Sequence, residues 1–145
     1  MNRRRENQSS QLAAIGYLYS AVGGLTGSAA IEVQRSSLHA FCRKQGLALD
    51  FCYTDFALSR RGRMQAVRHL LNRQGPQVLV IASLARLTRN PAVFSRIVDR
   101  ILAKGRDLVT ADGQLDTRTQ PGRLMVELMR VCGEVERDNA APTLH

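Results

Sequence analysis

A short apolar run at residues 77–81 limits the folds open to this chain more than any other segment. The run Gln77-Val78-Leu79-Val80-Ile81 is continuous and rich in β-branched side chains. A strand with one face in water alternates apolar and polar residues, whereas a strand of a parallel sheet that is covered on both faces is apolar throughout. The run therefore predicts a central strand of a parallel sheet with helices on both sides.

The rest of the chain supplies strands and helices in alternation, as such a sheet requires. Strands that alternate with helices form α/β folds, so we expect a three-layer sandwich with a mostly parallel central sheet. In one predicted strand, Leu47, Leu49, Phe51 and Tyr53 are expected on the same side. The patterning predicts strands at 14–19, 47–54, 77–81 and 107–111, helices at 31–45, 64–72, 91–104 and 122–139, and loops at 22–28, 55–62 and 112–120.

Arginine dominates the charge of the chain. Of the 21 lysine and arginine residues only Lys44 and Lys104 are lysines, and the net charge is +9 over 145 residues. Guanidinium groups match the geometry of phosphates, so this excess favours a polyanionic partner. Nucleic acid is the first candidate, ahead of an anionic membrane surface.

Two arginines lie at the point where a ligand of such a sheet would bind. Arg86 and Arg89 follow the strand at 77–81, and Asn90 is expected to cap a helix that begins at Pro91. Cations are disfavoured just before a helix unless an anion offsets them. Because ligands of parallel sheets bind beyond the carboxyl ends of the strands, we predict that Arg86 and Arg89 contact phosphate.

Two further features bear on the compartment. The sequence contains no run of about 18 apolar residues, and residues 1–11 lack the apolar core of a signal peptide, so we expect a cytoplasmic, nucleoid-associated protein. Cys42, Cys52 and Cys132 are an odd number without close pairing, so we expect buried structural cysteines and no disulfide framework.

Neither of two candidate sets of metal ligands is complete. One lacks a fourth ligand for a tetrahedral site, and the members of the other are far apart in separate loops. We therefore expect neither a metal nor a cofactor. The two sets are His39 with Cys42 and Cys52, and Asp55 with Asp112 and Asp116.

Seven short segments carry a family resemblance by their order and spacing. They are Gly16-Tyr17, Ile31-Glu32-Val33-Gln34-Arg35, Tyr53-Thr54-Asp55, Arg60-Arg61-Gly62, Leu84-Ala85-Arg86-Leu87-Thr88-Arg89, Asp116-Thr117 with Gly122-Arg123-Leu124-Met125, and Glu134-x-Glu136-Arg137. Together they resemble the catalytic domain of the serine site-specific recombinases, the resolvase/invertase family, from about residue 15 to residue 137.

The resemblance implies DNA chemistry that this chain carries only in part. In the family, a serine hydroxyl attacks a DNA phosphodiester and forms a phosphoserine link, while arginines hold the phosphate. The family serine falls on Ala21, the first-strand arginine on Tyr19, and an aspartate on Ala85. An alanine has no oxygen, so the family reaction cannot start at Ala21. The resemblance assigns DNA or phosphate binding to Arg60, Arg86, Arg89, Arg137 and Gln34.

Ser20 is the alternative nucleophile. Side chains alternate along a strand, so a shift of one residue directs Ser20 to the opposite face unless a bulge turns it back. Gly23 and Gly24 make the following loop pliable, which keeps an active recombinase that uses Ser20 as an open hypothesis.

The resemblance also sets an expected domain division. The division is a disordered basic arm at residues 1–10, a catalytic domain at residues 11–139 and a short tail at residues 140–145. The family continues into a long helix and a helix-turn-helix domain, which we do not find here. Any DNA binding is therefore expected to be led by phosphates and weakly sequence-specific.

Three functions stay open at this point. The first is a degenerate recombinase, a pseudoenzyme of a mobile element, that binds DNA or an active recombinase as a homodimer or heterodimer. The second is the active enzyme that uses Ser20. The third is an interaction module that does not bind DNA and pairs with a partner through its last helix.

The apolar stripe of that last helix is expected to pack on its own core, although Met125, Met129 and Cys132 widen it. The stripe comprises Leu124, Leu128, Val131 and Val135.

Overall fold

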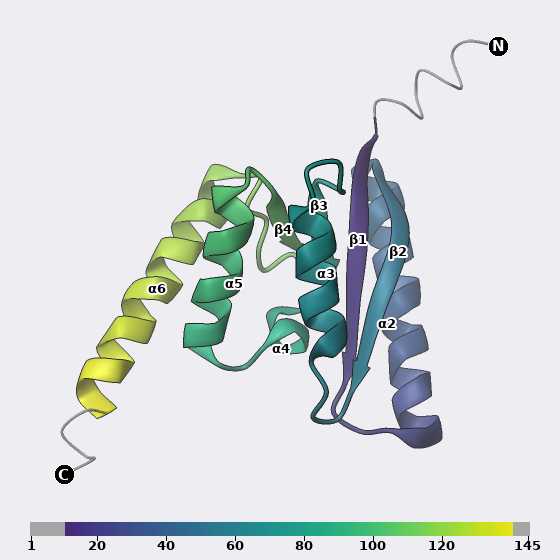
Figure 1. Cartoon of the computed structure of the whole chain (residues 1–145), viewed down its shortest axis with the longest axis horizontal. Coiled ribbons are helices and arrows are strands. Elements are labelled where there is room, and N and C mark those ends of the chain that lie inside the picture. The colour runs from purple at the N-terminus through teal and green to yellow at the C-terminus, as the bar shows by residue number, and fades with distance from the viewer. Residues whose placement is uncertain (1–10, 141–145) are drawn as a thin grey trace.

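The chain folds into a parallel sheet between two layers of helices (Figure 1). The computed structural model describes residues 11–140, with side chains as far as Gly133. The elements, in chain order, are β1 (Leu12–Ser20), α2 (Gly24–Gln45), β2 (Leu47–Phe56), α3 (Arg61–Leu71), β3 (Val78–Ile81), α4 (Leu84–Leu87), α5 (Pro91–Ala103), β4 (Asp107–Thr110) and α6 (Gln120–Ala140).

The sheet has the order β2-β1-β3-β4, and all three strand pairings are parallel. All four residues of β3 are buried, as the continuous apolar run at 77–81 predicts. The carboxyl ends of β1, β2 and β3 therefore meet along one edge, the lower edge of the sheet in Figure 1. The predicted α/β sandwich is confirmed.

Two apolar cores lie on the two faces of the sheet. Along β1, Ile15 and Tyr17 belong to the core that α3 and α5 cover, while Ala14 and Leu18 belong to the core that α2 covers. This alternation follows from the two-residue period of a strand. α6 packs outside α5, where Val126 and Met129 reach the first core.

The structure corrects two predictions of local structure. The predicted loop at 22–28 is wrong from residue 24 onward, because α2 begins at Gly24. The predicted alternation of the second strand is also wrong, because Asp50 is an extra residue: Ala14 pairs with Leu49, and Ile15 pairs with Phe51. A bulge of this kind shifts the side chains by one position, so Leu49 and Tyr53 pack on opposite faces of the sheet.

Predictions for the last helix and the cysteines hold only in part. Leu124, Leu128 and Val131 are each more than half exposed, so the expectation that this stripe packs on its own core is wrong where the structure describes it. Of the cysteines, Cys42 is buried, whereas Cys132 is exposed. α6 thus presents apolar side chains to solvent.

Two predicted helix boundaries are confirmed. Gly46 ends α2 in the left-handed conformation, with φ of 69°. The side chain of Asn90 caps α5, and its oxygen accepts the N–H groups of Ala92 at 2.8 Å and Val93 at 3.2 Å. Among the described residues, no helix is long and apolar enough to cross a membrane.

Candidate nucleic-acid interface

The carboxyl end of β1 is held in place by a buried amide. Gln34 of α2 is 4% exposed, and its Oε1 accepts the N–H of Tyr19 at 3.0 Å. Its Nε2 donates to the carbonyl oxygen of Tyr19 at 2.7 Å. The two bonds use both ends of the amide, so Gln34 positions β1 and does not point to solvent.

Asp55, the second-to-last residue of β2, caps the helix that follows. Its Oδ1 accepts the N–H of Gly62 at 2.8 Å, and its Oδ2 accepts the N–H of Arg63 at 2.9 Å. A Cβ on Gly62 would lie 2.9 Å from Asp55 Oδ1, so only glycine lets the first turn of α3 approach this closely. Carboxylates are stabilised at helix N-termini, where N–H groups lack partners within the helix.

Arg60 lies at the centre of a cluster of aromatic and basic side chains. Its guanidinium carbon stands 3.6 Å above the ring of Tyr19, a cation–π contact. Its Nη1 donates to the hydroxyl of Tyr17 at 3.0 Å and to the carbonyl oxygen of Arg86 at 3.1 Å. The Tyr17 hydroxyl in turn donates to Asp55 Oδ2 at 2.7 Å. The buried carboxylate thus orients Arg60 through a tyrosine.

Two more arginines join this cluster from either side. Arg86 Nη1 donates to the carbonyl oxygen of Tyr19 at 3.2 Å, and Arg63 Nη1 donates to the carbonyl oxygen of Leu87 at 2.9 Å. Arg60 and Arg86 therefore converge on the end of β1, although they are 26 residues apart in the chain.

The charge of this cluster is not neutralised by direct ion pairs within the described part of the chain. The ion pairs found there are made by Arg35, Arg118 and Arg130. Burial and the neighbouring charge of Arg60 lower the pKa of Arg63. Burial and the hydrogen bond to Asp55 raise the pKa of Tyr17, which keeps its proton. The cluster is therefore a site of positive potential that an anion would stabilise.

Ser20 and Ala21 directly follow Tyr19, which contacts the arginines, but they differ in access. Ala21 directly follows β1 and is exposed. Ser20 is 2% exposed, and its hydroxyl donates to the carbonyl oxygen of Val22 at 2.8 Å and accepts the N–H of Val22 at 3.3 Å. Ala21 is thus accessible but carries only a methyl group, whereas the hydroxyl of Ser20 is buried and hydrogen-bonded to the backbone of Val22.

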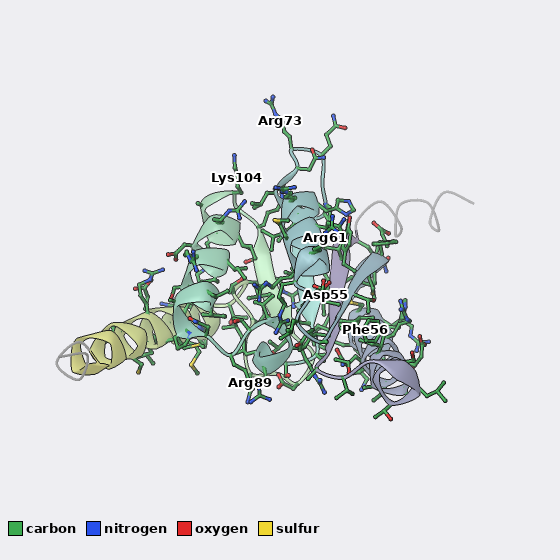
Figure 2. All side chains as sticks on the ribbon, turned by 60° about the horizontal axis from the view of Figure 1, so that its bottom comes forward. Asp55, Phe56, Arg61, Arg73, Arg89 and Lys104 are labelled. Carbon is green, nitrogen blue, oxygen red and sulfur yellow. The ribbon has the colours of Figure 1, made fainter. Side chains whose placement is uncertain are left out.

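The remaining predicted site residues are not joined to the cluster. Arg89 is exposed at the rim below α4 (Figure 2), and it lines a groove of about 300 Å³ next to α6. Ala85 is exposed on α4, a short helix that the sequence did not predict. Arg137 belongs to α6, but its side chain lies outside the described residues, as do the arm at 1–10 and the tail from residue 141.

Sequence reasoning missed three members of the cluster. From the sequence, Tyr17 has a place only in the first strand and its family motif, Tyr19 is only the position of a lost arginine, and Arg63 is not singled out. A signal was present for the tyrosines, because residues two apart on a strand share a face and both tyrosines lie near the carboxyl end of β1. Arg63 follows Arg60 by three residues at a helix start, which gave a weaker signal. Among the described residues, no three His, Cys, Asp or Glu side chains gather closely enough to hold a metal ion.

Known proteins share both the sequence pattern and the fold. The sequence profile described as "Resolvase, N terminal domain" matches residues 19–143. The N-terminal catalytic domain of TP901-1 integrase is similar in structure, with a TM-score of 0.79 and 17% identity over 88% of this chain and 98% of that chain. A resolvase family site-specific recombinase from Streptococcus pneumoniae has a TM-score of 0.81 and 18% identity over 92% of this chain and 93% of that chain.

A third structure is similar at a lower score. The C-terminal catalytic domain of ISC1926 TnpA, an IS607-like serine recombinase, has a TM-score of 0.60 and 16% identity over 83% of this chain and 98% of that chain. No curated protein sequence matches the chain. At these identities, the structural matches establish a shared fold.

Proposed function

This chain belongs to the resolvase family, and we propose that it is a serine-recombinase domain that binds DNA by a backbone phosphate and does not cut it. The observation that carries the proposal is the convergence of Arg60 and Arg86 on the end of β1, beside Ala21. Forked guanidinium groups without carboxylate partners favour a phosphate, and the net charge of +9 favours a polyanion.

The proposed loss of cleavage follows from the chemistry of the two residues at the end of β1. Transfer of a phosphodiester to the protein needs an oxygen that attacks phosphorus while the leaving oxygen departs. Ala21 offers none. The Ser20 hydroxyl would have to leave Val22 and reach across the strand to the face of the arginines, at the cost of buried hydrogen bonds.

Salt dependence of binding tests the phosphate contact. We would measure fluorescence anisotropy of a labelled 20-base-pair duplex at several salt concentrations. Each lost phosphate contact should flatten the slope of log K against log salt by about 0.9. Arg86→Ala should do so by removing the phosphate contact at the cluster. We propose that the exposed Arg89 contacts a second phosphate outside the cluster, so Arg89→Ala should do the same and the double variant should flatten the slope by about 1.8.

A matched control removes two charges from the opposite edge of the sheet. Arg43 and Lys44 lie in the last turn of α2, at its far end from the cluster, so Arg43→Ala with Lys44→Ala should leave the slope unchanged. An equal slope for the native protein and the Arg86→Ala variant would show that this arginine is structural and would refute the phosphate contact.

A covalent-adduct assay tests the loss of cleavage. A nicked duplex that traps a protein–DNA link, followed by a denaturing gel, should show no adduct for the native protein or for Ser20→Ala. Restoring the family pattern with Ala21→Ser, Tyr19→Arg and Ala85→Asp together should produce one. An adduct of the native protein that disappears in Ser20→Ala would instead establish an active enzyme with Ser20 as its nucleophile.

A second candidate function is pairing with another recombinase copy, identical or active. The exposed apolar stripe of α6 favours it, because Leu124 is 62% exposed and Leu128 is 55% exposed. Leu128 also lines the groove of about 300 Å³ beside Phe94 and Pro91. Sedimentation at micromolar concentration should show self-association that Leu124→Ser with Leu128→Ser abolishes. A monomer under these conditions would exclude the homodimer.

A further inference from the structure

Four apolar side chains are exposed on the two segments next to the arginine cluster. They belong to two segments: one runs from the end of β1 into the first turn of α2, and the other comprises the last residue of β2 and the turn after it. Leu25 is 92% exposed and Leu58 is 98% exposed, so almost nothing in the described chain covers either of them. We call this surface the apolar rim; it consists of Val22, Leu25, Phe56 and Leu58.

The two segments of the apolar rim are tied to each other. The N–H of Ala57 donates to the carbonyl oxygen of Ser20 at 2.9 Å. The Tyr19 hydroxyl donates to the carbonyl oxygen of Ala57. A Cβ on Gly27 would lie 3.3 Å from Phe56, so the first turns of α2 rest against the end of β2. Phe56 lies beside α2 in Figure 2, at the edge where the strands end.

The backbone of the apolar rim is strained at one point. Ala57 has a φ of 55°, a left-handed conformation that is uncommon for residues other than glycine. It lies between Phe56 and Leu58 and turns the chain while both neighbours remain exposed. Strain of this kind persists where the surrounding structure enforces it, and it concentrates at functional sites.

The apolar rim lies within one nucleotide's reach of the proposed phosphate site. Only Ser59 separates Leu58 from Arg60, so their Cα atoms are at most about 7 Å apart. Val22 directly follows Ala21. Residues 21–27 and 56–58 contain no charged side chain. A DNA strand whose phosphate is held by Arg60 and Arg86 would therefore have an uncharged, exposed apolar surface next to that phosphate.

We propose that the apolar rim is a wedge that enters the minor groove of a bound duplex and unstacks a base step beside the phosphate held by Arg60 and Arg86. This inference rests on the proposed function and specifies how the duplex is engaged. The minor groove is about 6 Å wide, which admits a leucine or phenylalanine side chain but not a helix. Apolar side chains that press between base pairs from this side kink the duplex toward the major groove.

The wedge would give the protein a preference for deformable DNA. Pyrimidine–purine steps such as TA unstack easily, whereas A-tracts are stiff. Two duplexes with the same number of phosphates but a central TA step or a central A-tract should therefore differ in affinity, with the TA duplex bound more tightly. Arginine contacts to phosphate alone would not favour the TA duplex, because the two duplexes have the same number of phosphates and the narrow groove of an A-tract attracts arginine more strongly.

The test separates the wedge from the phosphate contact. A 20-base-pair duplex carries fluorescein for anisotropy and 2-aminopurine at its central TA step, where unstacking raises the fluorescence. Leu25→Ser with Leu58→Ser should weaken binding about tenfold or more at every salt concentration, the ratio expected when about half of each leucine is buried. The salt slope should not change, and the rise in 2-aminopurine fluorescence should disappear.

Leu12→Ser is the matched control, because Leu12 is 47% exposed at the opposite end of β1. It should bind as the native protein does, and thermal unfolding should show that all variants fold. If the leucine variants bind with native affinity and native 2-aminopurine fluorescence, the wedge is refuted while the phosphate contact stands. If they instead lose self-association in sedimentation, the apolar rim is a protein contact. If the native protein does not bind the duplex at low salt, the proposed function fails, and the wedge with it.

Discussion

Replacing Asp55 by asparagine should destabilise the protein by roughly 3 kcal/mol. Asp55 is 4% exposed, and four donors converge on it: the N–H groups of Gly62 and Arg63 and the hydroxyls of Tyr17 and Ser59. Asparagine keeps one oxygen and places N–H groups at the other, so two donors lose an acceptor at about 1–2 kcal/mol each. Loss of the negative charge at the start of α3 adds about 0.5 kcal/mol.

Thermal unfolding followed by circular dichroism measures this cost. For a domain of this size, roughly 3 °C of Tm corresponds to each kcal/mol, so Asp55→Asn should lower Tm by about 10 °C. Asp112→Asn is the control, because Asp112 is exposed and accepts one N–H, from Gln114 at 3.1 Å; it should lower Tm by less than about 3 °C. If Asp55→Asn falls in the range of the control, the network around Asp55 does not stabilise the protein and the reasoning is wrong.

Three further predictions concern residues near the cluster and on α6. Gly62→Ala should lower the free energy of unfolding by about 1–3 kcal/mol, because its Cβ would lie 2.9 Å from the carbonyl oxygen of Thr54. The control is Gly133→Ala, whose Cβ would make only an ordinary van der Waals contact and which should be neutral or stabilising. Urea unfolding of both variants measures the difference. The raised pKa of Tyr17 means that its contribution to stability is complete below its ordinary pKa of 10.0 and is lost above it. The free-energy difference between the native protein and Tyr17→Phe should therefore stay constant up to that pH and then shrink; a flat difference to pH 12 would contradict the raised pKa. In alkylation at pH 8, Cys132 should react first, because it is exposed and burial raises the pKa of Cys42 to about 11; mass spectrometry of partly labelled protein would show whether another thiol reacts sooner.

The sequence predicted the phosphate site best where local chemistry decides the structure. Arg86 could be placed at the edge of the sheet, because the apolar run before it identifies a strand and Asn90 identifies the next helix. The spacing and the family resemblance both group Arg89 with Arg86. In the structure, α4 carries Arg86, which contacts the carbonyl oxygen of Tyr19, whereas Arg89 follows α4 and is exposed to solvent. A helix this short has too few residues for a periodic pattern to reveal it.

Side-chain partners across the sheet could not be predicted. Gln34 was assigned to DNA by resemblance, yet both ends of its amide bond the backbone of Tyr19. Ser20 was an open candidate, and only the structure reports its burial and its bonds to Val22. The apolar rim was missed because each of its residues fits an ordinary strand or loop pattern. Exposure depends on what the rest of the chain covers.

The sequence by itself determined the α/β class, the parallel sheet and the absence of an oxygen at Ala21, because strand periodicity, helix caps and side-chain chemistry are local properties. Only the tertiary structure decided which arginines meet. Arg60 and Arg86 come from segments 26 residues apart, and the parallel order β2-β1-β3 brings both to the end of β1. The bulge at Asp50 likewise set which face each side chain of β2 occupies. Such outcomes depend on pairing between distant segments, whose free energy no local pattern records.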